Sequence, residues 1–130
     1  MAGASFQIQV RHVQVEKKEI ADLLATTIGE AKNGVPQVQL LMKLARKYSN
    51  CPSKGDGGNL GWVEMGWNPE DPRKPRGGFQ KLENEELHNI ISNALEKNDI
   101  HQGLIYGPVQ TKQGYHVIII ANEFKTDRIL

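Results

Sequence analysis

The segment from Gly107 to Ile120, GPVQTKQGYHVIII, constrains the fold of this chain more than any other stretch. Gly107-Pro108 cannot continue a helix, and Gln113-Gly114 is typical of a tight turn. The positions after this turn are apolar in succession, so both faces of the strand that they form must be covered, as in the middle of a sheet. We therefore predict a hairpin of strands 104–110 and 115–123, joined by the turn 111–114.

The rest of the chain predicts one more strand at the start, a short strand in the middle and three helices. Phe6, Ile8, Val10 and His12 alternate with other residues, which is typical of one face of a strand. Apolar residues at helical spacing predict helices over 20–31 and from Pro36 to Tyr48. A short strand, 59–65, follows a glycine-rich run. The final helix is predicted to begin after Asn84, as N-cap, with an apolar stripe of Leu87, Ile90, Ile91, Ala94 and Leu95. The order β-α-α-β-α-β-β is that of an α+β domain.

Length and composition set the class of protein. A chain of 130 residues, 38% hydrophobic and 24% charged, fits one soluble globular domain. We place its core at about 6–123 and expect 66–81, rich in glycine and proline, to be an irregular inserted loop. A formal net charge of +1 does not favour nucleic acid or an anionic membrane as a partner, and we expect a monomer. One cysteine excludes an internal disulfide, and the first ten residues do not read as a signal peptide. We expect a cytoplasmic protein, or an organelle-matrix protein if a targeting segment has been removed.

Four segments, in this order, resemble a parvulin-type (PpiC/rotamase) peptidyl-prolyl cis/trans isomerase domain from about Val10 to Ala121. They are Arg11-His12-Val13, Leu44 to Ser53, Gly57 to Trp62, and Gly107 to His116. The resemblance implies a four-stranded antiparallel sheet surrounded by helices, and an enzyme that accelerates X–Pro isomerisation during protein folding. It implies proline-containing peptides and unfolded or flexible protein segments as partners, with no metal or organic cofactor.

The resemblance also implies the site. His12 and His116 match the paired imidazoles at its centre, where each would bond to the other or to Thr111. Cys51 stands where the family has a cysteine or an aspartate, which implies an electron-rich lining rather than a nucleophile. Leu60 matches an apolar wall of the proline pocket, and Gln113 a polar turn position.

The proline pocket departs from the family pattern after the glycine-rich strand. Asn68 stands near the position of a methionine, and an insertion follows. The residues that could complete the pocket are Met65, Trp67, Phe79 and Leu87.

Selectivity for phosphorylated Ser/Thr-Pro segments is not favoured. The resemblance places the basic residues of phosphate-directed parvulins from Glu16 onward, and a carboxylate there would repel a phosphate. Lys17 and Lys18 follow, but Glu19 dilutes their charge. A weaker alternative anion site is formed by Arg73, Lys74 and Arg76.

Other interpretations of the same residues stay open. A peptide-binding or chaperone module of this fold that has lost turnover is the main alternative, because the 67–81 segment is altered. A Cys51–His116 thiol enzyme is a weaker one. Cys51 could also be a small buried apolar residue. His88 and His101 match no motif and are expected at the surface, while Trp62 is expected in the core.

Overall fold

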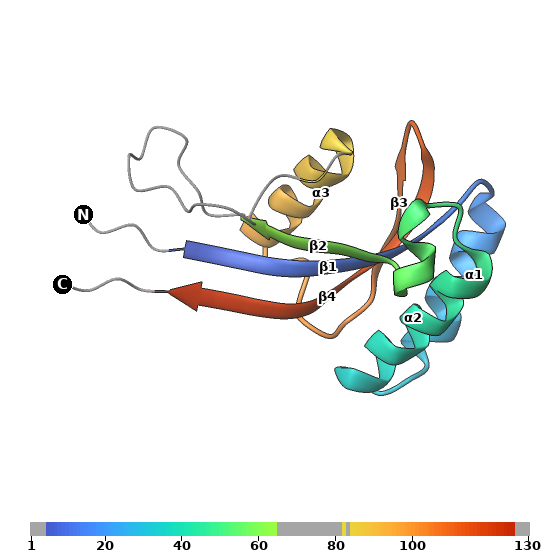
Figure 1. The fold of residues 1–130 in the computed structure, drawn as a ribbon, viewed down its shortest axis with the longest axis horizontal. Helices are drawn as coiled ribbons and strands as arrows, with labels where there is room; N and C mark the ends of the chain where they lie inside the picture. Colours follow the sequence, from blue (N-terminus) through green and yellow to red (C-terminus); the bar gives the residue numbers. More distant parts are fainter. Residues whose placement is uncertain (1–4, 65–81, 83, 127–130) are drawn as a thin grey trace.

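The computed structural model describes residues 5–64, 82 and 84–126, and these form a single antiparallel sheet with helices on both faces (Figure 1). The strand order is β2-β1-β4-β3. The strands are β1 (Ser5–Val15), β2 (Asn59–Glu64), β3 (Tyr106–Thr111) and β4 (Gly114–Thr126). β4 pairs with β1 along nearly its whole length, and with β3 across the predicted hairpin turn. The predicted α+β class and strand count are confirmed, and the buried second strand of the hairpin is central.

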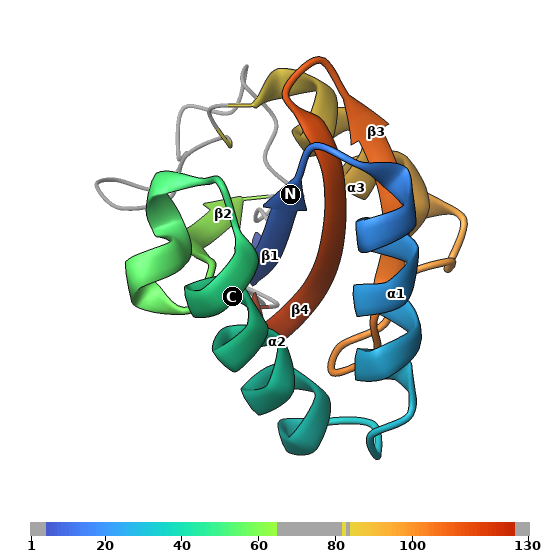
Figure 2. The same cartoon turned by 90° about the vertical axis from the view of Figure 1, so that its right-hand side faces the viewer.

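The helices divide between the two faces of the sheet. Two of them, α1 (Lys18–Gly29) and α2 (Val35–Tyr48), cover one face, and α3 (Glu85–Glu96) covers the other (Figure 2). A short 3-10 helix, η1 (Pro52–Asp56), connects α2 to β2 and was not predicted from the sequence. No helix within the described ranges is long and apolar enough to cross a membrane.

Each face of the sheet has its own apolar core, because successive side chains of β4 point to opposite sides. Ile118 and Ile120 enter the α3 core, together with residues such as Leu87 and Ile91 of α3. Val117 and Ile119 enter the α1/α2 core, with residues such as Leu24 of α1. These β4 side chains are fully buried, which explains the run of apolar residues in the sequence.

The N-cap of α3 agrees with the sequence pattern, whereas the buried face of α1 does not. Asn84 caps α3 as predicted, because its side chain accepts a hydrogen bond from the main-chain N–H of Leu87. In α1, however, Ile20 and Leu23 are 42% and 66% exposed, although both fit the apolar stripe. The helix buries Ala21, Leu24 and Ile28 instead, which leaves Ile20 and Leu23 outside the packed face.

Candidate active site

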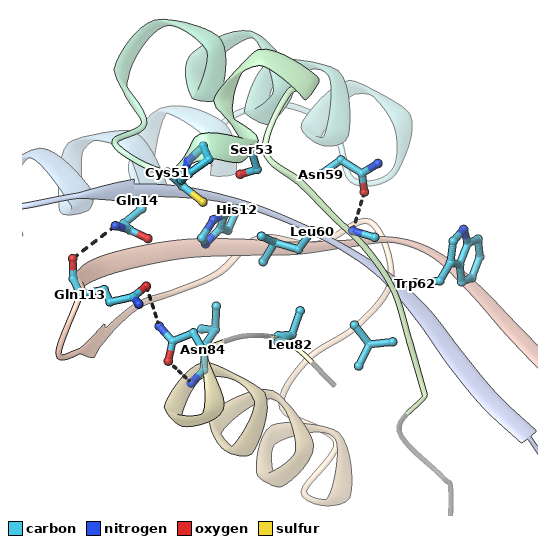
Figure 3. A pocket seen from close by; sticks show the side chains of 14 residues that line it. His12, Gln14, Cys51, Ser53, Asn59, Leu60, Trp62, Leu82, Asn84 and Gln113 are labelled. Atoms are coloured by element: carbon cyan, nitrogen blue, oxygen red, sulfur yellow. Dashed lines mark hydrogen bonds between the residues drawn. The ribbon is translucent and has the colours of Figure 1, made fainter. Parts of the chain in front are cut away.

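A pocket of about 610 Å³ opens on the α3 side of the sheet, between β1, β2, η1 and the start of α3. Figure 3 shows Cys51 and Ser53 on one side of His12, and Asn84 and Leu82 on the opposite side. The described residues that line the pocket include four predicted site residues besides His12, which are Cys51, Leu60, Leu87 and Gln113. Segments far apart in the sequence therefore converge here, as predicted.

The two predicted histidines form a buried pair. His12 is opposite Ile118 in the β1–β4 ladder, and His116 is opposite Gln14, so the two rings are diagonal neighbours on one face. Their Nδ1 atoms lie 3.1 Å apart, and the rings are nearly parallel, with 14° between their planes. The His12 side chain lines the pocket, and its Nε2 is buried with no hydrogen-bond partner among the described residues.

Thr111 contacts the imidazole pair on the His116 side. Its Oγ1 lies 2.7 Å from Nε2 of His116. The same oxygen accepts hydrogen bonds from the main-chain N–H of Gln113 and from Nδ2 of Asn84, each at 3.1 Å. Neither Thr111 nor His116 is among the residues that line the pocket. The two side chains therefore lie behind His12 and not at the pocket surface.

Both imidazoles are neutral at neutral pH. Burial, and then the like charge of His116, lower the pKa of His12 to about 3. Burial lowers the pKa of His116 to about 4, against the opposing effect of the Glu86 carboxylate. A neutral pair can orient hydrogen bonds, but it is a poor acid near neutral pH.

Cys51 is held against β1 by its neighbours rather than by its own thiol. Oγ of Ser49 accepts from the main-chain N–H of Gln14 at 3.0 Å and of Cys51 at 3.3 Å. The main-chain N–H of Asn50 donates to the carbonyl oxygen of Gln14 at 2.7 Å. Cys51 is free and half-buried, and its thiol lines the pocket beside His12 (Figure 3). The thiol makes no hydrogen bond to a described residue, so no activating base is in place.

The apolar part of the pocket comes from Leu60 of β2, Leu87 of α3 and Leu82. Leu60 and Leu87 were predicted, and both line the same pocket. Met65, Trp67 and Phe79, the other candidates for the proline pocket, lie outside the described residues, as do Arg73, Lys74 and Arg76.

Several lining residues were missed from the sequence. Gln14 was detectable, because it is two residues beyond His12 in the strand and so shares its face. Ser53 and Asn59 lie in the matched segments but drew no role. Asn84 was predicted only as a helix cap, since no sequence pattern reveals that its side chain reaches Thr111.

Two predictions for other aromatic rings were wrong. Trp62 is only half-buried and lines the pocket instead of the core. His88 is 9% exposed on α3, where its Nδ1 accepts a hydrogen bond from the main-chain N–H of Leu82 at 3.4 Å. His101 is exposed, as predicted.

The comparison with known families decides the identity of the domain. The rotamase family, described as the PPIC-type PPIase domain, matches residues 8–122. The chain belongs to this family. It is a PpiC-type peptidyl-prolyl cis/trans isomerase domain, and the predicted parvulin resemblance is confirmed.

Three similar proteins are much longer than this chain. The PpiC-type domain is 38% identical over 65 residues to the Rhodanese-like/PpiC domain-containing protein 12, chloroplastic, of Arabidopsis thaliana. The matched residues make up 50% of this chain and 20% of that protein. The domain is 29% identical over 123 residues to Chaperone SurA of Methylobacillus flagellatus, covering 93% of this chain and 23% of SurA. A chain from the work on PEB4 and the periplasmic protein Cj1289, two SurA-like chaperones of Campylobacter jejuni, superposes with a TM-score of 0.62 at 25% identity, covering 91% of this chain and 39% of that chain.

The PpiC-type domain corresponds to only part of each of these relatives. The chain spans about a fifth of the curated relatives that it matches. One relative is named as a chloroplast protein, and the work on the structural relative concerns a periplasmic protein, so they do not support the expected cytoplasmic location. That location and the expected monomer stay predictions.

Proposed function

We propose that the pocket beside His12 and Cys51 is the isomerase site, and that it acts on exposed X–Pro bonds without requiring a phosphate. The observation that carries this proposal is that His12, one member of a neutral, buried imidazole pair, shares a pocket with leucine side chains. The family assignment supports isomerisation rather than a binding module without turnover, so the main alternative is not favoured.

The reaction explains why such a pocket suffices. Rotation about an X–Pro bond faces a barrier of about 18–20 kcal/mol because amide resonance must be broken. No bond is made or cut, so a catalyst only has to bind the twisted amide more tightly than the planar one. An apolar wall for the proline ring and a few fixed hydrogen-bonding groups in a water-poor cleft achieve this.

The described residues divide these tasks between them. Leu60, Leu82 and Leu87 supply an apolar surface for the ring. His12 and Cys51 stand beside the twisting amide as a polarisable lining. His116 and Thr111 hold the His12 ring in place from behind.

A thiol-enzyme mechanism receives no support from the geometry. His12 is the histidine that lines the pocket with Cys51, and its Nδ1 is hydrogen-bonded to His116 and not to the thiol. Without a base to remove its proton, a thiol is a weak nucleophile near neutral pH.

The loop after β1 supports a substrate without phosphate. Glu16 is exposed at the position where phosphate-directed relatives are expected to begin their basic residues. Lys18 is paired with Asp22 through an Nζ–Oδ2 distance of 2.8 Å, which leaves it less charge to offer an anion. Lys17 alone gives a weak attraction at an exposed site.

The test is an isomerisation rate, measured by NMR exchange on a panel of X–Pro peptides with the purified chain. We expect acceleration by the wild type, a loss of at least about tenfold in kcat/KM for His12→Ala, and no change for His101→Ala, whose ring is exposed away from the pocket. Uncatalysed relaxation across the whole panel would remove the enzyme proposal. For the phosphate question, Ser-Pro, phosphoserine-Pro and Glu-Pro peptides are compared, and a clear preference for the phosphorylated peptide would contradict the proposed selectivity.

A further inference from the structure

Asn84 occupies a position with a fixed orientation of its side-chain amide. It caps α3, where its Oδ1 accepts from the main-chain N–H of Leu87 at 3.1 Å. A main-chain N–H can only donate, so the oxygen of the Asn84 amide must face Leu87. Nδ2 therefore faces the other way, 3.1 Å from Oγ1 of Thr111 and 3.4 Å from Oε1 of Gln113.

This orientation determines what the Thr111 hydroxyl can do. A hydroxyl has two lone pairs and one proton. The Asn84 amide and the main-chain N–H of Gln113 occupy the two lone pairs. The hydroxyl proton is left for Nε2 of His116, at 2.7 Å.

The proton position on Thr111 fixes which nitrogen donates in each histidine ring. A neutral imidazole that accepts at Nε2 has its proton on Nδ1. Nδ1 of His116 therefore donates to Nδ1 of His12, 3.1 Å away. His12 accepts at Nδ1, so its own proton is on Nε2, the nitrogen that has no partner among the described residues.

We propose that Asn84 is a positioning residue, which sets the direction of the hydrogen bonds through Thr111 and His116 so that His12 carries its proton on Nε2, the buried nitrogen without a described partner, and not on Nδ1. An N–H is the group that can bind the carbonyl oxygen of a twisting imide. The catalytic meaning of this arrangement rests on the proposed function, whereas the positions of the ring protons do not.

The decisive variant is Asn84→Asp. Aspartate has nearly the same shape and also caps helices, so the bond to Leu87 is kept. The amide nitrogen, however, is replaced by an oxygen that accepts from the Thr111 hydroxyl. Thr111 must then accept from Nε2 of His116, and the direction reverses through both rings. Asn89→Asp is the matched control, because Asn89 is an exposed residue of α3 and its change adds the same charge to the same helix.

The primary measurement is the NMR assignment of the ring protons through the nitrogen chemical shifts of the histidines at neutral pH. We expect Nδ1–H on His116 and Nε2–H on His12 in the wild type and in Asn89→Asp, and the reverse pattern in Asn84→Asp. Asn84→Ser keeps a capping hydroxyl but is too short to reach Thr111, so we expect both patterns to be populated. A wild-type proton on Nε2 of His116, or an unchanged pattern in Asn84→Asp, would overturn the proposal.

Isomerisation rates separate this proposal from the proposed function. We expect Asn84→Asp to lower kcat/KM by about tenfold or more, and Asn89→Asp to stay within about twofold of the wild type. An inactive wild type with the expected ring protons would contradict the proposed function and support the role of Asn84. Reversed ring protons with an unchanged rate would overturn the claim that the direction matters for catalysis.

Discussion

The α carbon of Gly58 lies directly against the main-chain carbonyl of His12, because a β carbon added to Gly58 would overlap with the His12 oxygen. The same two residues are also hydrogen-bonded, because the main-chain N–H of His12 donates to the carbonyl oxygen of Gly58 at 3.0 Å. Gly58 also has a φ of +79°, which L side chains rarely adopt. The glycine-rich run thus places the loop after η1 against β1 at the residue on which the site depends.

Gly58→Ala is therefore expected to destabilise the domain strongly and to displace His12. The left-handed conformation alone costs about 1–2 kcal/mol, and the contact with a rigid carbonyl adds to it. Chemical denaturation gives the loss of unfolding free energy, and the isomerisation rate reports the displacement.

Two other glycines separate these causes. Gly61 has a φ of +90° with no atom near an added β carbon, so Gly61→Ala shows the conformational cost alone. Gly55 has neither constraint, and Gly55→Ala should be nearly neutral. Equal stability of the Gly58 and Gly55 variants would contradict this account.

The free energy of unfolding is expected to fall as the pH drops below the ordinary histidine pKa of about 6.5. His12 and His116 have lowered pKa values of about 3 and about 4 in the folded state. Between these values and about 6.5 the unfolded chain binds more protons, so stability is complete above this window and is lost through it. At about pH 5 each ring accounts for a loss of about 2 kcal/mol.

Urea titrations at a series of pH values measure this dependence. His101→Gln, which removes an exposed ring, should retain the full decrease. A stability that is the same at about pH 5 as at about pH 8 would mean that the imidazole pair is not buried in its neutral form.

Ser53→Ala should leave stability unchanged or raise it by up to about 1 kcal/mol, because Oγ of Ser53 is buried without a partner among the described residues. The Ser53 residue lines the pocket but its hydroxyl is buried, so we expect little change in KM or kcat. Ser49→Ala is the contrasting variant: its Oγ accepts two main-chain bonds beside Cys51, and its loss should cost about 1–3 kcal/mol. A Ser53 variant as destabilised as the Ser49 variant would show that its hydroxyl has a structural partner.

Cys51→Asp is expected to retain isomerisation to within about tenfold, since an electron-rich lining and not a nucleophile is required beside the twisting amide. The same change removes any thiol chemistry. Rates on X–Pro peptides, with unfolding curves to confirm the fold, measure the effect. A folded variant with only the uncatalysed rate would restore the thiol interpretation.

The elements that the sequence predicted best are those whose pattern is local. The apolar run of β4 requires burial on both faces, and Asn84 followed by an apolar stripe marks the start of α3. The pairing of His12 with His116 followed from family resemblance, because no local pattern joins residues 104 positions apart. His88 and Leu23 were misjudged for the same reason, since the side of a helix that is buried depends on the elements packed against it.

The sheet separates the domain into two compartments with different freedom to change. The face under α1 and α2 has an apolar core of its own, built from residues that do not line the pocket. Packing there can be exchanged among residues of similar volume at a cost in stability alone. The face under α3 shares Leu87, Leu82 and Val63 between core and pocket, so an alteration there changes folding and substrate contact together. Diversification of such domains is thus least restricted on the side away from the imidazoles.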